Sequence, residues 1–116
     1  MRLTTDFWVS ALIRNVFRTG GFAAVVKRGA TEAGAVFITI RDRLGRVTLY
    51  GPAAQASYDT AKPDDRLFTV LISDGEGEAV DQRLAKEARF DPDVWVVELE
   101  PGDQGNAEFI AIAAPG

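Results

Sequence analysis

Apolar residues near the N-terminus recur at the spacing of a helix. Trp8, Leu12 and Val16 lie four residues apart, and Val9, Ile13 and Phe17 repeat beside them. Residues at this spacing share one face of an α-helix, and the polar residues between them fall on the other side. Thr4 or Thr5 suits the N-cap, and Gly20-Gly21 suits the left-handed turn that ends a helix. The pattern predicts a helix over about Asp6 to Arg18.

The stretch from Gly21 to Pro52 changes to the pattern of β-strands. Strands are predicted at Phe22 to Arg28, Ala35 to Arg41 and Val47 to Tyr50. The middle one is almost continuously apolar, which is typical of a strand covered on both faces. Gly45 suits the positive-φ position of a short hairpin loop. We expect these three strands to be neighbours and to form the centre of a sheet.

The second half of the chain adds further strands and one more helix. Arg66 to Ser73 is rich in β-branched and apolar residues and predicts a strand. Ser73-Asp74 suits the N-cap of a helix that must stop before Asp91-Pro92, because proline disfavours helical geometry in the preceding residue. Asp93 to Glu100 alternates as a strand does. Ala107 to Ala113 is compatible with a sixth strand or with a loosely held tail.

The order of these elements predicts one α+β domain. We expect a largely antiparallel sheet of five or six strands with two helices, in the order α-β-β-β-β-α-β with an optional final β. Residues 1–100 form the domain, and the Gly/Ala-rich hairpin or tail at 101–116 belongs to it. We expect the first helix to cover one face of the sheet, with the second helix packed beside it or at an edge.

Composition excludes several kinds of chemistry. The 116 residues include no Cys and no His. Thiolate nucleophiles, disulfides, imidazole metal ligands and the usual Ser-His-Asp arrangement are therefore excluded. We expect no catalytic residue, metal site or cofactor. An enzyme would have to use Asp91, Asp93, Tyr50 or Tyr58, and the two aspartates also suit the turn that precedes a strand.

The charge is divided unevenly between the two halves of the chain. Met1 to Tyr58 holds eight basic and three acidic residues, a formal charge of +5, and the remainder holds five basic and fourteen acidic residues, a charge of −9. Arg41, Arg43 and Arg46 at the predicted hairpin are candidates for binding nucleic acid or another anion. The alternative, which we favour, is that the halves neutralise each other and that charged side chains protect strand edges.

A second candidate site follows the third predicted strand. Tyr50, Gln55 and Tyr58 form a polar and aromatic group around the Gly51-Pro52 turn. Such a group is a candidate pocket lining, but we favour the alternative that it is a turn with a packed tyrosine.

The N-terminus does not resemble a targeting segment. Its apolar part is interrupted by Asp6, Arg14 and Arg18, so it lacks the continuous apolar region of a signal peptide. No stretch approaches the ~20 apolar residues that span a bilayer. We therefore expect a cytoplasmic protein without a membrane partner.

Four segments together resemble a known family. They are FWVSALIRNVFRTGGFAAVVKRG, GAVFITI, LYGPA-Q and RFDPDVWVVELE. In combination they are similar to the alphaproteobacterial domain-of-unknown-function family numbered 1491, over roughly Asp6 to Glu100. The resemblance implies a small bacterial cytoplasmic protein. It supplies no activity, cofactor or catalytic residue, and Pro101 to Gly116 lies outside it.

These observations lead to three hypotheses about function. The first is a non-enzymatic binding or assembly module, with a homodimer covering an open face or edge of the sheet. The second is binding of nucleic acid or another anion through the basic N-terminal half. The third is an enzyme that uses the aspartates and tyrosines named above, and we favour a non-enzymatic role over it.

Overall fold

The part of the chain that the structure describes forms two helices and six strands. The computed structural model describes residues 4–53, 66–102 and 110–112. In chain order the elements are α1 (Thr5–Arg18), β1 (Phe22–Lys27), β2 (Val36–Arg41), β3 (Val47–Pro52), β4 (Leu67–Gly75), α2 (Gly77–Phe90), β5 (Trp95–Glu100) and β6 (Ala111–Ile112). The predicted α+β class and element order are confirmed. No helix of the described ranges is long and apolar enough to cross a membrane.

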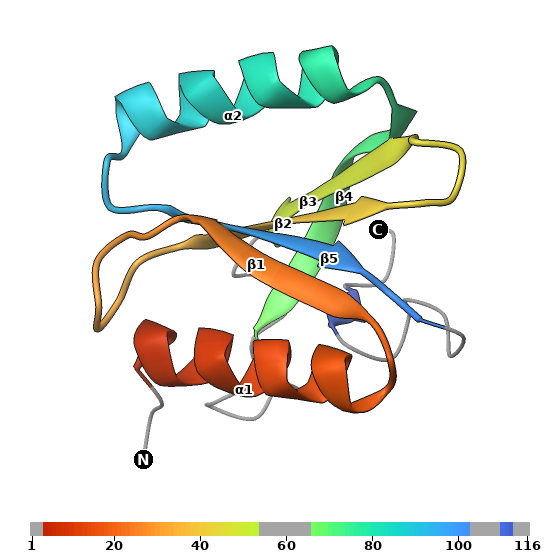
Figure 1. Cartoon of the computed structure of the whole chain (residues 1–116). Coiled ribbons are helices and arrows are strands. Elements are labelled where there is room, and N and C mark those ends of the chain that lie inside the picture. The colour runs from red at the N-terminus through yellow and green to blue at the C-terminus, as the bar shows by residue number, and fades with distance from the viewer. Residues whose placement is uncertain (1–3, 54–65, 103–109, 113–116) are drawn as a thin grey trace.

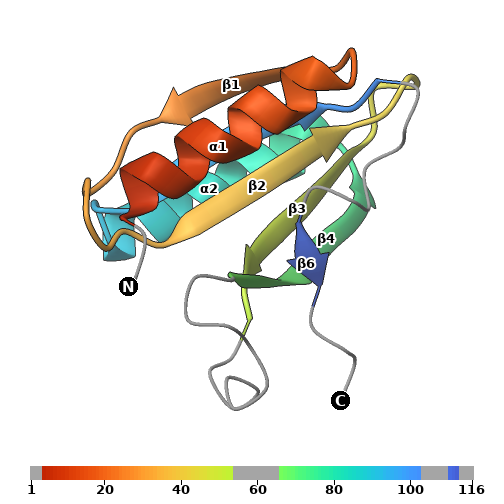
Figure 2. The ribbon, with the colours of Figure 1, turned by 90° about the horizontal axis from the view of Figure 1, so that it is seen from below.

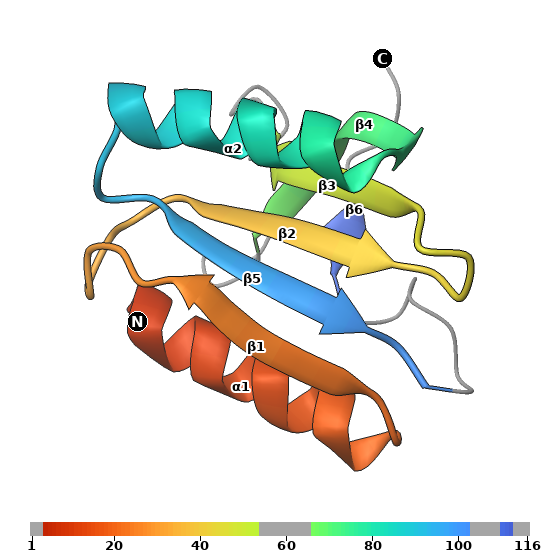
Figure 3. The same cartoon turned by 45° about the horizontal axis from the view of Figure 1, so that its top comes forward.

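The six strands form one mixed, mostly antiparallel sheet in the order β1-β5-β2-β3-β4-β6. β5 runs parallel to β2, β6 runs parallel to β4, and the other neighbouring pairs are antiparallel. The expectation that the first three strands are all neighbours is wrong, because β5 lies between β1 and β2 (Figure 3). β5 suits a central position because Trp95, Val96 and Val97 are all buried.

The connection from β1 to β2 passes over the start of β5, and two glycines allow this crossing. A Cβ atom on Gly29 would lie 2.1 Å from the carbonyl oxygen of Asp93, and one on Gly34 would lie 2.4 Å from the same oxygen. Contacts this short leave no room for any side chain. The glycines therefore permit β5 to insert between two strands that are consecutive in sequence.

The two helices cover opposite faces of the sheet, as Figure 1 shows. α1 buries Val9, Leu12 and Val16 against one face, in a core that includes Trp95 and Phe68. α2 places Val80, Leu84 and Ala88 on the other face, against Phe37, Leu49 and Val96. The expectation that α2 packs beside α1 or at an edge is therefore wrong. The almost continuous apolar run of β2 predicted a strand that is covered on both faces. This prediction is confirmed, because the side chains of β2 alternate between two separate cores.

Both ends of α1 follow the sequence signals. The side chain of Thr4 accepts a hydrogen bond from the backbone nitrogen of Phe7 at 3.2 Å, as an N-cap does. Gly20 has a φ of 88° after the last turn, a conformation that glycine adopts without strain. The buried hydroxyl of Thr5 donates to the carbonyl oxygen of Gly34 at 3.0 Å and so ties the start of α1 to the crossing connection.

The start of α2 differs from its prediction. β4 continues to Gly75, so Ser73 and Asp74 lie in a strand, and the N-cap is Glu76, whose side chain makes no capping bond. Asp74 has a φ of 53°, which turns the chain toward the helix. At the other end of the chain, Ile110 is buried in the α1-side core and β6 pairs with β4. A sixth strand therefore exists at 111–112, while 107–109 and Ala113 lie outside the described residues.

Candidate binding surface

The outer side of β1 is an open strand edge. β1 pairs with β5 on one side, and among the described residues no strand pairs with the other side. In Figure 2 the helix α1 lies in front of the sheet, with β1 on one side of it and β2 on the other, so β1 projects past the helix. Phe22, Val25 and Val26 are 48%, 38% and 63% exposed. We call this outer side of β1, with these three side chains, the β1 edge.

The single charged residue of β1 does not protect this edge. Nζ of Lys27 donates to the carbonyl oxygens of Pro92 at 2.7 Å and of Val94 at 2.9 Å. Its charge is thus directed back toward the start of β5, whereas edge lysines usually face outward and prevent pairing with other chains. A shift in register between Val25 and Lys27 interrupts the strand near its end. The unprotected part is therefore Phe22 to Val26, which is wholly apolar.

An aromatic pair extends the apolar surface from β1 to α1. The rings of Phe17 and Phe22 meet edge to face with centroids 5.8 Å apart. Phe17 is 50% exposed, so both rings remain accessible although they contact each other. Exposed aromatic and branched side chains that lie together are typical of surfaces that bind other proteins.

A shallow groove lies next to the β1 edge, on the face of the sheet that carries α2. The space between its lining atoms, counted together with the open solvent at its mouth, is about 310 Å³. Its lining is apolar at Val26, Val47, Val80, Leu84 and Val96 and polar at Thr39, Arg41, Asp81 and Glu98. Arg41 and Glu98 form a partly exposed ion pair at 3.8 Å across the strands β2 and β5. We call this feature the α2 groove, and Val26 belongs both to it and to the β1 edge.

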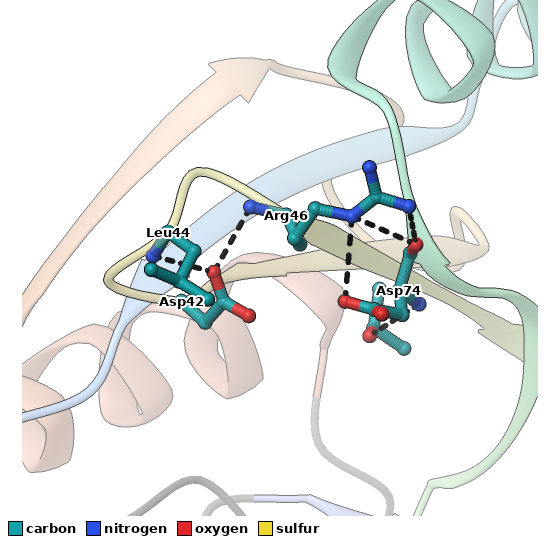
Figure 4. A network of polar contacts seen from close by, with 5 residues as sticks. Asp42, Leu44, Arg46 and Asp74 are labelled. Atoms are coloured by element: carbon teal, nitrogen blue, oxygen red, sulfur yellow. Dashed lines mark hydrogen bonds and ion pairs between the residues drawn. The ribbon is translucent and has the colours of Figure 1, made fainter.

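The three arginines of the predicted anion site have three different environments. Arg41 lines the α2 groove beside Glu98. Arg43 is exposed in the turn between β2 and β3 and makes no ion pair with any described residue. Arg46 donates from its guanidinium to the carbonyl oxygen of Asp74 and lies 3.5 Å from its carboxylate. Figure 4 shows that this guanidinium points at Asp74.

Arg46 therefore joins the β2–β3 turn to the end of β4. In the turn, a carboxylate oxygen of Asp42 accepts hydrogen bonds from the backbone nitrogens of Leu44 and Arg46, both at 2.9 Å. The backbone nitrogen of Asp74 in turn donates to the hydroxyl of Thr48 at 3.2 Å. These contacts hold the left-handed conformation of Asp74. A structural role thus accounts for Arg46, and anion binding by the three arginines stays a prediction.

The uneven charge of the two halves is partly neutralised within the fold. Arg41 pairs with Glu98 and Arg46 pairs with Asp74, so bases of the first half meet acids of the second. Arg28 pairs with Asp6 at 2.8 Å, and its guanidinium lies over the ring of Trp95 at 4.9 Å. Arg28 also lies at the end of the sheet opposite the β2–β3 turn, so the basic residues do not form one site.

The predicted pocket residues are only partly visible. Tyr50 lies on β3, half-buried against the α1-side core, and burial raises the pKa of its hydroxyl above the ordinary value. Gln55 and Tyr58 lie outside the described residues.

A carboxylate oxygen of Asp91 accepts a hydrogen bond from the backbone nitrogen of Asp93 at 3.1 Å, as expected of a turn. Within the described ranges no three acidic side chains converge to hold a metal ion.

The sequence analysis missed the β1 edge, although the sequence contains a signal for it. The segment FAAVV has no charge and two alanines, and a strand that is covered on both faces needs larger side chains. Such a composition indicates a strand at the border of the sheet. Its place at the edge follows from the strand order, in which β5 lies between β1 and β2.

Comparison with known proteins places the chain among proteins without an assigned activity. A family model described as "Protein of unknown function (DUF1491)" matches residues 3–109. The match extends past Glu100, where the resemblance in the sequence had ended. No curated protein matches the chain.

Solved structures from two alphaproteobacteria resemble the whole chain. A solution structure of an Agrobacterium tumefaciens protein is 43% identical with a TM-score of 0.84, and the match covers 100% of this chain and 98% of that one. A crystal structure of a DUF1491 family protein from Caulobacter crescentus is 32% identical with a TM-score of 0.77, covering 97% and 100%. An NMR structure of a DUF1491 family protein from the same organism is 33% identical with a TM-score of 0.75, covering 98% and 99%.

Proposed function

We propose that this chain, which belongs to the DUF1491 family of proteins of unknown function, is a non-enzymatic assembly module that binds another polypeptide at the β1 edge. The observation that carries this proposal is an apolar edge strand whose only charged side chain, Lys27, is turned inward. An open edge offers unpaired backbone N–H and C=O groups, and a strand of another polypeptide satisfies them by extending the sheet.

The side chains around the edge favour such an added strand. Successive residues of a strand point to opposite faces, so an added strand presents side chains to both sides of the sheet. At the start of β1 it meets Phe22, whose ring contacts Phe17, and further along it meets Val26 and the α2 groove. Backbone hydrogen bonds then supply affinity, and these two apolar surfaces supply selectivity.

The chemistry of the chain supports binding more than catalysis. The chain has no Cys or His to act as a nucleophile or a base near neutral pH. The aspartates that remained as candidates serve the turn before β5. Tyr50 has a raised pKa, so its hydroxyl stays protonated at neutral pH and does not supply a phenolate to act as a base.

Site-specific photo-crosslinking in an alphaproteobacterial host tests this proposal. A photoreactive amino acid replaces Ala24, in the middle of the β1 edge, and in a control protein it replaces Leu44, which is 87% exposed in the β2–β3 turn. We expect a covalent adduct with a polypeptide from position 24 and none from position 44. The adduct must also disappear when Val26→Lys is added. Equal labelling from both positions, or no adduct from position 24, would overturn the proposal.

A further inference from the structure

We infer that the polypeptide bound at the β1 edge is a second copy of this chain. The two β1 strands pair antiparallel about a two-fold axis near Ala24, so that one sheet continues through both copies. This inference rests on the proposed function and specifies its partner. Two features of β1 and its surroundings favour a second copy over an unrelated strand, and a third sets the expected strength of the dimer.

The first feature is the order of side chains along β1. When an antiparallel pair is centred on Ala24, Phe22 of one copy lies opposite Val26 of the other, and this contact occurs twice. Cross-strand pairs of an aromatic and a β-branched residue stabilise sheets. The small Ala24 side chains meet at the axis, where two bulky groups would crowd each other. The strand is therefore complementary to its own reversed copy.

The second feature is the distribution of charge along the edge. Glu100 and Glu98 of β5 lie beside Phe22 and Ala24, at the first end of β1. Lys27 and Arg28 lie at the other end, and the side chain of Arg28 is 61% exposed. An antiparallel arrangement brings the acidic end of each copy to the basic end of the other. Arg28 also pairs with Asp6 on the α1 side of the sheet, so the attraction between the two ends acts over a longer range than a direct contact.

The third feature is the size of the apolar surface, which sets the expected strength. A stable protein interface buries about 800 Å² on each partner. A pair of six-residue strands supplies only part of that area, and Phe17, Phe22 and Val26 add contacts on both sides of the sheet. We therefore expect a dimer with a dissociation constant on the order of micromolar, which dissociates on dilution and weakens as salt screens the end charges.

Analytical ultracentrifugation of the full chain over a concentration series tests this inference. We expect a reversible monomer–dimer equilibrium. Val26→Lys places two charges at the interface and raises the dissociation constant about ten-fold or more. Leu44→Lys, the same kind of change at an exposed apolar residue away from β1, leaves it within about two-fold. Circular dichroism spectra confirm that both variants are folded.

Charge reversal tests the antiparallel arrangement separately. Glu100→Arg places like charges at both ends of the interface and weakens the dimer. Adding Arg28→Glu to the same chain restores opposite charges at both ends and recovers most of the affinity. Recovery is not expected if Glu100→Arg acts only by disturbing the fold of each copy.

Two outcomes separate this inference from the proposed function. A wild-type chain that stays monomeric up to about 1 mM, far above the expected dissociation constant, overturns self-pairing. If photo-crosslinking at position 24 then still yields an edge-dependent adduct with a different polypeptide, the proposed function survives. If it yields no adduct, both fail. A dimer that Val26→Lys and Leu44→Lys weaken equally also overturns the inference, because its interface would lie elsewhere.

Discussion

The ring of Phe17 meets the ring of Phe22 edge to face, with centroids 5.8 Å apart. This contact joins the last turn of α1 to the first residue of β1, across the tight turn at Gly20. It therefore fixes the helix relative to the edge strand. It also keeps two large apolar rings half-exposed at the place where we propose that another polypeptide binds.

Removing the first of these rings is expected to lower stability measurably. Phe17→Ala should reduce the free energy of unfolding by about 1 kcal/mol more than Phe7→Ala, because an aromatic pair contributes about 0.5–1.5 kcal/mol beyond area burial. Phe7 is the matched control, since it is also on α1 and is 59% exposed. Urea denaturation of both variants measures the difference. Equal losses would show that the ring contact contributes nothing.

The contact between Arg46 and Asp74 predicts a difference between two neighbouring arginines. Arg46→Ala should cost about 1 kcal/mol, because it removes hydrogen bonds that hold a left-handed residue, in a partly exposed setting. Arg43→Ala should stay within about 0.5 kcal/mol, as is usual for an exposed residue without such contacts. Thermal or urea unfolding compares the two. A larger loss for Arg43→Ala would contradict the structural role given to Arg46.

The close crossing of the β1–β2 connection over β5 predicts that an alanine at Gly29 lowers stability. An alanine at Gly77, which lies away from the crossing, is the control and should raise it. Gly29→Ala should cost about 2 kcal/mol or more, because its Cβ would lie 2.1 Å from the carbonyl oxygen of Asp93 and the backbone would have to move. Gly77→Ala has open space around its Cβ at the start of α2 and should gain about 0.4–1 kcal/mol. Denaturant unfolding measures both. Similar values for the two variants would show that the close crossing is wrong.

The raised pKa of Tyr50 predicts a loss of stability in alkali. Burial raises the pKa of the folded hydroxyl above its unfolded value, so its contribution is fully present below about pH 10. It is lost as the pH rises through the folded pKa. Between pH 9 and 11 the wild type should therefore lose more unfolding free energy than Tyr50→Phe, which cannot ionise there. Urea titrations at the two pH values test this, and parallel losses would contradict the burial of the hydroxyl.

Local features of the fold were predictable because they depend on neighbouring residues. The spacing of Trp8, Leu12 and Val16 gave α1, and the run before Arg41 gave β2, because helix and strand periods appear directly in the sequence. The arrangement of elements was less accessible. The position of β5 depends on contacts between residues far apart, which periodicity does not contain. The placement of α2 on the second face follows from the same long-range packing.

At the candidate surface, too, local features were predictable from the sequence and contacts between distant segments were not. The basic residues around the β2–β3 turn were visible in the sequence, but their partners Asp74 and Glu98 were not, because each pair joins distant segments. The left-handed conformation of Asp74 also gave no signal, since Ser73-Asp74 resembles an ordinary helix cap. The bonds from Lys27 to the carbonyl oxygens of Pro92 and Val94 likewise join segments far apart in the sequence.

Disulfide crosslinking at Ala24 tests the central claim most directly. The chain has no native cysteine, so Ala24→Cys introduces a single thiol at the proposed two-fold axis. Opposed residues of antiparallel strands have Cβ atoms about 4.5–5.5 Å apart, close to the separation that a disulfide requires. We predict that mild oxidation converts this variant into a covalent dimer, and that adding Val26→Lys prevents it. Ala24→Cys that stays monomeric, or that crosslinks no faster than the exposed control Leu44→Cys, would contradict pairing of two copies through β1.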